Sequence, residues 1–282
     1  MTIEETDIEG LKPDNEARII WAKEQDQPTQ TAFVYLHGFG ASQREGQPIM
    51  QELSARYEAN VYMTRLPEHG IYRENSFEFL TPERYLQAAD HALSIGRKLG
   101  ERVILVSTST GGALSLILAA ANPDIAGLIL YSPFIDVFDT SALRLLEPGA
   151  KEKFIEKNNS PMRLRERPAE QAKYWSTNYH VNGYFALFQV VKTHMIPATF
   201  SKVTCPVYLG YYYKNEKEQD QVVSVAAMLK MFEKLGTAAG RKHSIAFPES
   251  GDHVIGCDLR SNDWESVLET TIDFIDRHIV NE

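Results

Sequence analysis

The feature that most limits the folds open to this chain is an alternation of short apolar segments with longer segments of helical periodicity. Two of the short segments, residues 103–106 and 128–130, are apolar at every position. Strands covered on both faces have this composition, whereas a strand with one face in solvent alternates apolar and polar residues. The chain is therefore predicted to form an α/β fold, a mostly parallel central sheet flanked by helices.

The same pattern gives bounds for the expected elements. Strands are expected at residues 17–21, 32–36, 61–66, 102–106, 127–131, 206–212 and 243–247. Helices are expected at residues 46–57, 82–99, 111–121, 222–235 and 264–279. Thr81 and Pro82 form a cap and a first-turn proline for the second helix, and the spacing of Ser42 and Glu45 predicts a capping box before the first.

Residues 133–202 interrupt this alternation. No convincing strand occurs in this stretch, which is rich in aromatic side chains and contains more Lys and Arg than Asp and Glu. We expect residues 1–132 and 203–282 to form the core domain, and residues 133–202 to form a mostly helical cap inserted over the sheet. The alternative is a second packing layer with no role in chemistry, because aromatic residues commonly pack in cores.

Charge and composition exclude several classes of protein. The net charge of −9 disfavours a nonspecific nucleic-acid-binding protein, which needs a basic surface. Only Cys205 and Cys257 occur, so no disulfide framework is expected. The acidic start from Met1 to Asp7 is unlike a secretion signal, and the longest apolar stretch, residues 113–121, is too short to span a membrane. These features predict a soluble, cytoplasmic protein without a nucleic-acid partner or a membrane span.

A serine-rich turn follows the expected strand at residues 102–106. It reads Ser107-Thr108-Ser109-Thr110-Gly111-Gly112 and leads directly into a helix. A nucleophilic serine on such a turn stands above the sheet in a strained conformation, and it requires small residues two positions before and after it. Ser107 and Gly111 occupy those positions around Ser109, which is the predicted nucleophile. Ser107 is an alternative nucleophile, and an anion-binding helix start is an alternative use of the turn.

A glycine-containing loop after the second expected strand suits oxyanion stabilisation. Acyl transfer requires two backbone N–H groups where the carbonyl oxygen becomes negative. We expect Phe39, in the segment His37-Gly38-Phe39-Gly40, and Thr110, directly after Ser109, to supply them. A purely structural turn is the alternative explanation of this loop.

A serine nucleophile also needs an imidazole base that a carboxylate orients. His253 follows the last expected strand, and Asp220 follows the strand at residues 206–212, so both would lie at the carboxyl edge of the sheet. A helix N-cap is the alternative role of Asp220, and Asp136 is the second candidate acid. His37 and His69 are expected to make structural hydrogen bonds. No spacing indicates a metal site, and no cofactor is implied.

The order Ser109, Asp220, His253 resembles the α/β-hydrolase superfamily, close to its bacterial carboxylesterases and monoacylglycerol-lipase-like esterases. The resemblance covers most of the chain from about residue 17 and rests on the segments Leu36-His37-Gly38-Phe39-Gly40, Leu66-Pro67-Glu68-His69-Gly70, 107–112, 220–223 and 250–254. It implies the α/β-hydrolase fold with a helical lid after the sixth strand, which fits residues 133–202. Three departures stand out: Ser107 and Glu68 where glycine is usual, and a long loop before Asp220.

The resemblance implies a serine hydrolase that cleaves a carboxylic ester through an acyl-serine intermediate, as a carboxylesterase or lipase-like enzyme does. The expected substrate is a small-molecule ester with an apolar acyl group and an anionic or polar leaving group, because the insertion is aromatic and slightly basic. A thioesterase, a peptidase or a carbon–carbon bond hydrolase would use the same triad. A non-catalytic ligand-binding homologue or an interaction scaffold built on the lid is the alternative outside enzymes.

Overall fold

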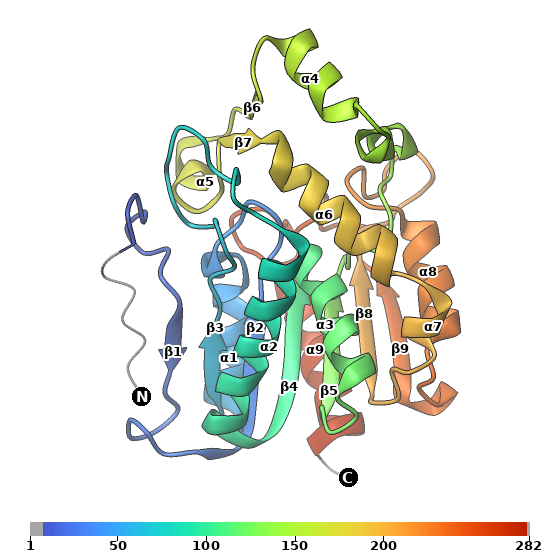
Figure 1. Cartoon of the computed structure of the whole chain (residues 1–282). Helices are drawn as coiled ribbons and strands as arrows, with labels where there is room; N and C mark the ends of the chain where they lie inside the picture. Colours follow the sequence, from blue (N-terminus) through green and yellow to red (C-terminus); the bar gives the residue numbers. More distant parts are fainter. Residues whose placement is uncertain (1–7, 281–282) are drawn as a thin grey trace.

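Seven strands form a single twisted sheet in the computed structural model of the chain, which describes residues 8–280 (Figure 1). Its spatial order is β1-β3-β2-β4-β5-β8-β9, and only β1 runs antiparallel to its neighbour. The strands are β1 (Arg18–Ile20), β2 (Thr29–Leu36), β3 (Asn60–Met63), β4 (Gly100–Thr108), β5 (Gly127–Tyr131), β8 (Val207–Tyr211) and β9 (Lys242–Ala246). Parallel neighbours end at the same edge, so the loops after β2, β4, β8 and β9 emerge together.

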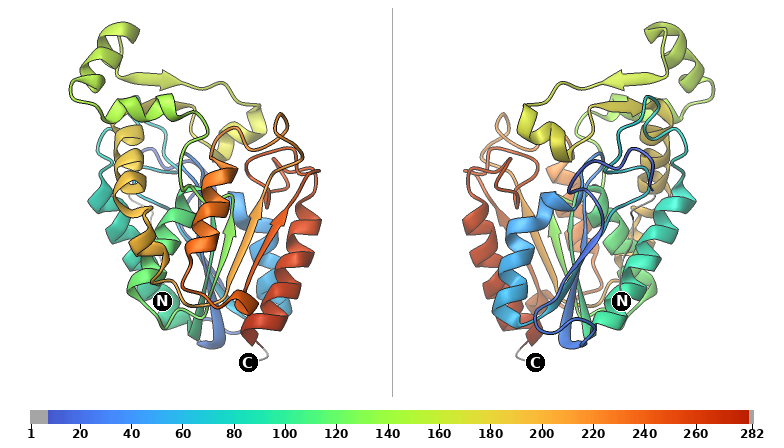
Figure 2. Two further views of the ribbon diagram at one scale, coloured as in Figure 1. Left: turned by 90° about the vertical axis from the view of Figure 1, so that its right-hand side faces the viewer. Right: turned by 90° about the vertical axis from the view of Figure 1, so that its left-hand side faces the viewer.

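Helices cover both faces of this sheet (Figure 2). The helices on one face are α2 (Pro82–Leu99), α3 (Thr110–Ala121) and α8 (Val225–Lys234). On the other face lie α1 (Gln47–Tyr57) and α9 (Trp264–Ile275), the latter continued by a π-helical turn at Asp276–Val280. All seven expected strands and all five expected helices are present, with ends shifted by only a few residues.

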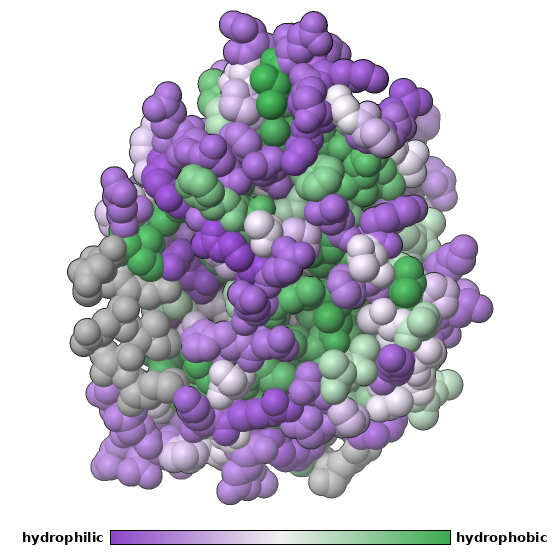
Figure 3. Space-filling model, in the orientation of Figure 1, coloured by the Kyte–Doolittle hydropathy of each residue, from purple (hydrophilic) through white to green (hydrophobic). Residues whose placement is uncertain are grey.

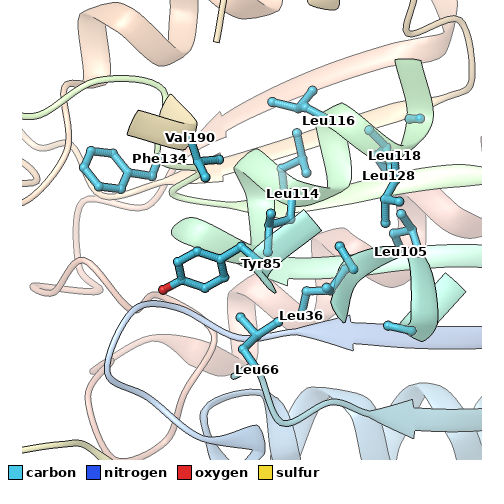
Figure 4. Packing of buried hydrophobic residues seen from close by; sticks show 14 of the residues in the cluster. Leu36, Leu66, Tyr85, Leu105, Leu114, Leu116, Leu118, Leu128, Phe134 and Val190 are labelled. Carbon is cyan, nitrogen blue, oxygen red and sulfur yellow. The ribbon is translucent and has the colours of Figure 1, made fainter. Parts of the chain in front are cut away.

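The apolar strands supply two cores, because successive side chains of a strand point to opposite faces. In β4, Val103 and Leu105 join the cluster under α2 and α3, whereas Ile104 and Val106 join the cluster under α1 and α9. Figure 4 shows the first cluster, where leucines of β2, β4 and β5 meet leucines of α3. The uninterrupted apolar run of β4 thus reflects burial on both faces.

The two predicted helix caps have different outcomes. Thr81 caps α2, since its side chain accepts a hydrogen bond from Arg84 N, with Pro82 in the first turn. The prediction of a capping box by Ser42 and Glu45 is wrong. The segment Gln43–Gly46 is a 3₁₀ turn, and the Ser42 side chain makes no capping hydrogen bond. The Glu45 carboxylate accepts a hydrogen bond from Gly38 N instead. The packing of Glu45 inside the protein outweighs a local preference that is worth only about 1 kcal/mol.

The chain between β5 and β8 is mostly helical, and it contains two short strands that the sequence pattern did not reveal. Its elements are η2 (Thr140–Leu146), α4 (Ala150–Asn158), β6 (Met162–Leu164), α5 (Ala169–Tyr174), β7 (Asn178–His180), α6 (Val181–His194) and α7 (Pro197–Phe200). β6 and β7 pair with each other alone. At three residues each, they are too short to show an alternating pattern.

Two parts of this segment differ in position (Figure 2). Helix α6 packs against the sheet-bound helices α2 and α3. By contrast, α4 and β6 project beyond the carboxyl edge of the sheet. The segment follows β5, which is the fifth strand within residues 8–280. The expected position after a sixth strand is therefore wrong, because these residues form five strands before the segment, and only one of them, β1, comes before β2 and β3.

None of the helices within residues 8–280 combines the length and apolar character that crossing a membrane requires. The prediction that the segment from Met1 to Asp7 is unlike a secretion signal concerns residues outside the described part of the chain.

Candidate active site

Ser109 occupies the sharp turn between β4 and α3. Its backbone is held at φ 55° and ψ −115°, a conformation that few residues other than glycine adopt. Such strain persists only where the surroundings impose it, and it concentrates at functional sites. Ser109 N donates to Tyr131 O, and Ser109 O accepts from Phe134 N, so the adjoining strand and its following loop hold the turn.

The two glycines after Ser109 are required by close packing. A Cβ atom on Gly111 would overlap the backbone carbonyl of Leu36, and one on Gly112 would lie 2.6 Å from the Cβ of Pro133. The first turn of α3 is therefore pressed between β2 and the loop after β5. Ser107, the alternative nucleophile, lies within β4 and is fully buried, with Oγ 3.5 Å from Ile129 O. It lies below the turn on which Ser109 stands.

The loop after β2 runs directly against Ser109. A Cβ atom on Gly38 would lie 3.2 Å from the Cβ of Ser109, so glycine permits this approach. Thr110 begins α3, where the first N–H groups have no intrahelical acceptor. Among residues 8–280, no protein group accepts a hydrogen bond from the N–H of either Phe39 or Thr110. Both predicted donors are thus available to a bound oxygen.

His253 and Asp220 meet at the same edge of the sheet. His253 Nδ1 lies 2.5 Å from Asp220 Oδ2, and Asp220 is 1% exposed. Burial by itself lowers the pKa of His253, but the charge and hydrogen bond of Asp220, with the charges of Asp252 and Glu45, raise it above its usual value. The imidazole is therefore held with Nδ1 toward the carboxylate, which leaves Nε2 for another group.

The second oxygen of Asp220 holds the backbone. Asp220 Oδ1 accepts from Val222 N at 2.8 Å and from Val223 N at 3.0 Å. Asp220 does not cap α8, because that helix begins at Val225 and its N-cap is Ser224. The carboxylate thus has one oxygen fixed in its own turn and the other directed at His253.

The long loop before Asp220 closes on itself. Lys214 N donates to Glu218 O, and an isolated bridge joins Tyr213 to Gln219. Asp220 N then donates to Tyr212 O, which returns the chain to the end of β8. The additional residues therefore form an outward turn and leave Asp220 at the strand end.

The second candidate acid, Asp136, makes no hydrogen bond with His253, whose carboxylate partner is Asp220. Asp136 Oδ1 accepts from Val137 N, and its backbone carbonyl accepts from Ser224 N. The structure therefore joins Asp220 and His253 directly and places Ser109 beside the Gly38 loop. Ser109 Oγ makes no hydrogen bond with His253 or with any other side chain in the described part of the chain. Such contacts are often long before substrate binds.

Comparison with known proteins identifies the family. The alpha/beta hydrolase family matches residues 33–259, which span β2 to the segment after His253. The chain belongs to this family. No curated protein is similar to it in sequence.

Solved structures agree on the α/β-hydrolase fold. One, described with LipS and LipT, two metagenome-derived lipolytic enzymes, has a TM-score of 0.76 at 18% identity over 95% of this chain and 100% of the other. A monoglyceride lipase from Saccharomyces cerevisiae has a TM-score of 0.70 at 13% identity over 94% and 92%. An enol-lactonase from Burkholderia xenovorans has a TM-score of 0.61 at 15% identity over 93% and 96%. These similarities confirm the predicted fold, and the family match over residues 33–259 confirms the predicted family.

One site residue of this α/β hydrolase was not recognised from sequence. Glu45 is 2% exposed, and its Oε2 accepts from Gly38 N at 2.7 Å and from Tyr35 OH at 3.1 Å. Burial raises the pKa of Glu45, while Gly38 N–H and the nearby imidazole of His253 act in the opposite direction. Glu45 thus lies against Gly38 in the segment His37-Gly38-Phe39-Gly40, here called the oxyanion loop, and no local motif distinguishes it from a helix cap.

The other histidines of this edge have structural roles. His37 Nδ1 lies 2.9 Å from Gly38 O, and its Nε2 accepts from Leu66 N at 3.0 Å. Burial lowers the pKa of His37 to about 4, so this ring is neutral and fixes the loop to the chain after β3.

Glu68, at a position where glycine is usual, adopts φ 66°. Its buried carboxylate pairs with Arg73 and Arg84.

An aromatic wall faces the oxyanion loop of this α/β hydrolase. The ring of Phe39 lies 5.1 Å from Phe77, 5.4 Å from Tyr179 and 5.2 Å from Tyr184. Tyr179 belongs to β7 and Tyr184 to α6, so the inserted segment contributes directly to the surroundings of the loop. Phe77 and Tyr179 stack with an interplanar angle of 7°.

Proposed function

We propose that this α/β hydrolase cleaves carboxylic esters through an acyl-serine intermediate. The observation that carries the proposal is the left-handed backbone of Ser109, at φ 55° on the strand-to-helix turn. The hydrogen-bonded pair of Asp220 and His253 at the same edge supports it. A serine presented in this way is suited to attack a carbonyl carbon once an imidazole accepts its proton.

Each group then has a chemical task. Ser109 Oγ attacks the ester carbonyl while His253 Nε2 takes its proton and passes it to the departing alcohol. Asp220 keeps the imidazole in the required tautomer and stabilises its charged form. The N–H groups of Phe39 and Thr110 bind the oxyanion, and removing one such donor costs about 3–4 kcal/mol in a comparable hydrolase. Water, activated by His253, then releases the acid.

Ester substrates fit the surroundings of the site. The partly exposed rings of Phe39 and Tyr184, backed by the buried ring of Phe77, offer apolar contact to an acyl group. The proposal therefore concerns a small-molecule ester with an apolar portion. Thioesters, peptides and carbon–carbon bonds are the competing substrates, since function depends on the pocket more than on the fold.

The test uses Ser109→Ala. This variant is expected to hydrolyse p-nitrophenyl esters at least 10⁴-fold more slowly than the wild type, because the nucleophile is absent. A fluorophosphonate probe should label the wild type stoichiometrically at Ser109 and leave the variant unlabelled. Circular dichroism checks that the variant is folded. Full activity in the variant, or a wild type that neither reacts with the probe nor turns over any ester, would refute the proposal.

A matched substrate panel tests the bond specificity. Ester, thioester and amide compounds with the same acyl group separate an esterase from a thioesterase and a peptidase. We expect the highest kcat/KM with the oxygen ester, and a higher value with the amide would replace the proposal by peptidase activity.

A further inference from the structure

A large cavity lies under the projecting part of the inserted segment. Its volume is about 1650 Å³, and η2, α4 and β6 supply most of its walls. Figures 1 and 2 show α4 and β6 standing away from the remainder of the molecule at this place. Ser109 and His253 do not line this cavity, so it is distinct from the candidate active site.

The side chains around the cavity are predominantly basic. The six basic residues in its walls are Arg144, Lys153, Lys157, Arg163, Arg165 and Arg167. Only three acidic residues, Glu74, Glu147 and Glu166, accompany them. The whole chain carries a net charge of −9, so this local excess of positive charge runs against the charge of the protein. A concave surface with one sign of charge concentrates ions of the opposite sign.

Arg163, Arg165 and Arg167, here called the arginine triplet, lie together on and after β6. No ion pair joins the triplet to a carboxylate anywhere in residues 8–280. The Arg167 guanidinium donates only to Ser176 O and to the hydroxyl of Tyr179, both at 2.9 Å. Three guanidinium groups thus border one cavity without an anionic partner among residues 8–280.

The triplet is linked to the candidate active site through one layer of aromatic rings. The Arg163 guanidinium lies 5.8 Å from the ring centre of Tyr184, and Tyr184 lies 5.2 Å from Phe39. Burial raises the pKa of Tyr184 to about 12, and the positive charges of the whole triplet act in the opposite direction. Arg163 therefore contacts Tyr184 directly, and Arg167 contacts Tyr179, whose ring lies 5.7 Å from that of Tyr184.

We propose that the cavity binds an oxyanionic group, a carboxylate or a phosphate, on the ester substrate. The planar guanidinium presents paired N–H donors that match these groups. The apolar part of such a substrate would pass the aromatic wall, while its ester reaches Ser109. This inference rests on the proposed esterase function and goes further by stating that the ester substrate carries a negative charge.

Two matched pairs of esters test the proposal by kinetics. The first pair is mono-p-nitrophenyl adipate and its neutral methyl ester, with the charge on the acyl side. The second pair is 4-acetoxybenzoate and its methyl ester, with the charge on the leaving group. We expect kcat/KM for the anionic member of at least one pair to exceed that of its neutral partner about tenfold or more. One hydrogen bond between charged groups stabilises the bound state enough for a ratio of this size.

Arg165→Gln should reduce this anionic preference about tenfold, since it removes one guanidinium from the cavity wall. Lys98→Gln is the matched control: it removes the same charge from an exposed position on α2, and the preference should stay unchanged. High salt should weaken the preference of the wild type. Equal kcat/KM for both members of each pair, or equal preference in Arg165→Gln and wild type, overturns the proposal.

A binding experiment separates this proposal from the proposed chemistry. Ser109→Ala is titrated calorimetrically with hexanoate, hexyl phosphate and hexanol. Binding of either anion, its loss in the Ser109→Ala/Arg165→Gln double variant, and weaker binding of hexanol support the anion site even if no ester is hydrolysed. The comparison of hexanoate with hexyl phosphate identifies the preferred oxyanion. Equal binding of hexanol and both anions, or no binding of any of the three, overturns the proposal.

Discussion

Helices α3 and α4 illustrate two regions built in opposite ways. Nine residues of α3, which follows Ser109, are buried, and the helix is pressed against β2 and Pro133. Helix α4, in the projecting part, has no buried residue, and neither do η2 and α5. The first region holds the backbone of Ser109 in a strained conformation. The second borders a cavity with exposed polar side chains, most of which appear hydrophilic in Figure 3.

The difference suits two separate tasks. A reacting group must be held to within a fraction of an ångström, and only a densely packed scaffold resists such strain. Substrate recognition by charge tolerates exposed, loosely packed side chains. Under the proposals made above, the projecting part would select substrates by charge, while the packed loops that carry Ser109 and His253 hold the reacting groups.

The largest expected effect is on the Asp220–His253 pair of the packed region. Asp220→Asn keeps an oxygen for Val222 N and Val223 N but removes the negative charge that selects the imidazole tautomer. In a comparable hydrolase this exchange lowers kcat about 10⁴-fold. Steady-state kinetics on a p-nitrophenyl ester measures the effect. Asp136→Asn is the control and should retain activity, and an equal loss in both variants would contradict the assignment of Asp220.

The second prediction compares identical substitutions in the two regions. Leu105 is fully buried in β4, whereas Leu164 in β6 is 79% exposed. Leu105→Ala should reduce the free energy of unfolding by about 2–5 kcal/mol, because it leaves a cavity in the core. Leu164→Ala should change it by less than about 0.5 kcal/mol. Chemical denaturation measures both values, and a large effect at Leu164 would show that the projecting part is packed more tightly than described.

The smallest expected effect concerns Glu45. Glu45→Gln keeps the size of the side chain but removes its charge, which weakens the hydrogen bond from Gly38 N and displaces the loop. Because a displaced oxyanion donor stabilises the transition state less, we expect kcat to fall between about tenfold and a hundredfold. Tyr35→Phe removes the other hydrogen bond to this carboxylate and is the matched control, with a smaller loss expected. An unchanged kcat in Glu45→Gln would show that the loop does not depend on the carboxylate.

The pH profile distinguishes this positioning role from a structural one. His253 must be neutral to accept a proton, so kcat/KM falls as pH drops through its pKa. Since the negative charges of Asp220, Asp252 and Glu45 raise that pKa, the acidic limb of the wild type should lie above 6.5. Glu45→Gln removes one of these charges and should move the limb to lower pH. A limb that stays in place would exclude an electrostatic effect of Glu45 on His253.

The sequence predicted the elements of the packed region well because its signals are local. Uninterrupted apolar runs identified β4 and β5, and Thr81 with Pro82 marked the start of α2. The pair Gly111 and Gly112 indicated a tight turn, and the structure shows why side chains are excluded there: the backbone of Leu36 and the ring of Pro133 lie against the two glycines. By contrast, β6 and β7 escaped prediction, since strands of three residues have too few positions for a pattern.

Glu45 shows why part of the site could not be predicted. Its spacing from Ser42 favours a capping box, and only the folded chain brings Gly38 N and Tyr35 OH within reach of the carboxylate. A hydrogen bond from a buried backbone N–H satisfies a carboxylate that would otherwise be costly to bury. The tertiary contact therefore overrides the local preference.

The sequence by itself determined the sheet, its covering helices and the strand ends after which Ser109, Asp220 and His253 follow, because burial leaves periodic patterns in neighbouring residues. The tertiary structure decided which oxygen of Asp220 faces His253, that Glu45 lies beside Gly38, and that the arginine triplet shares a cavity with residues of η2 and α4. These arrangements join separate segments of the chain, and their energies depend on distances and burial that no local pattern records.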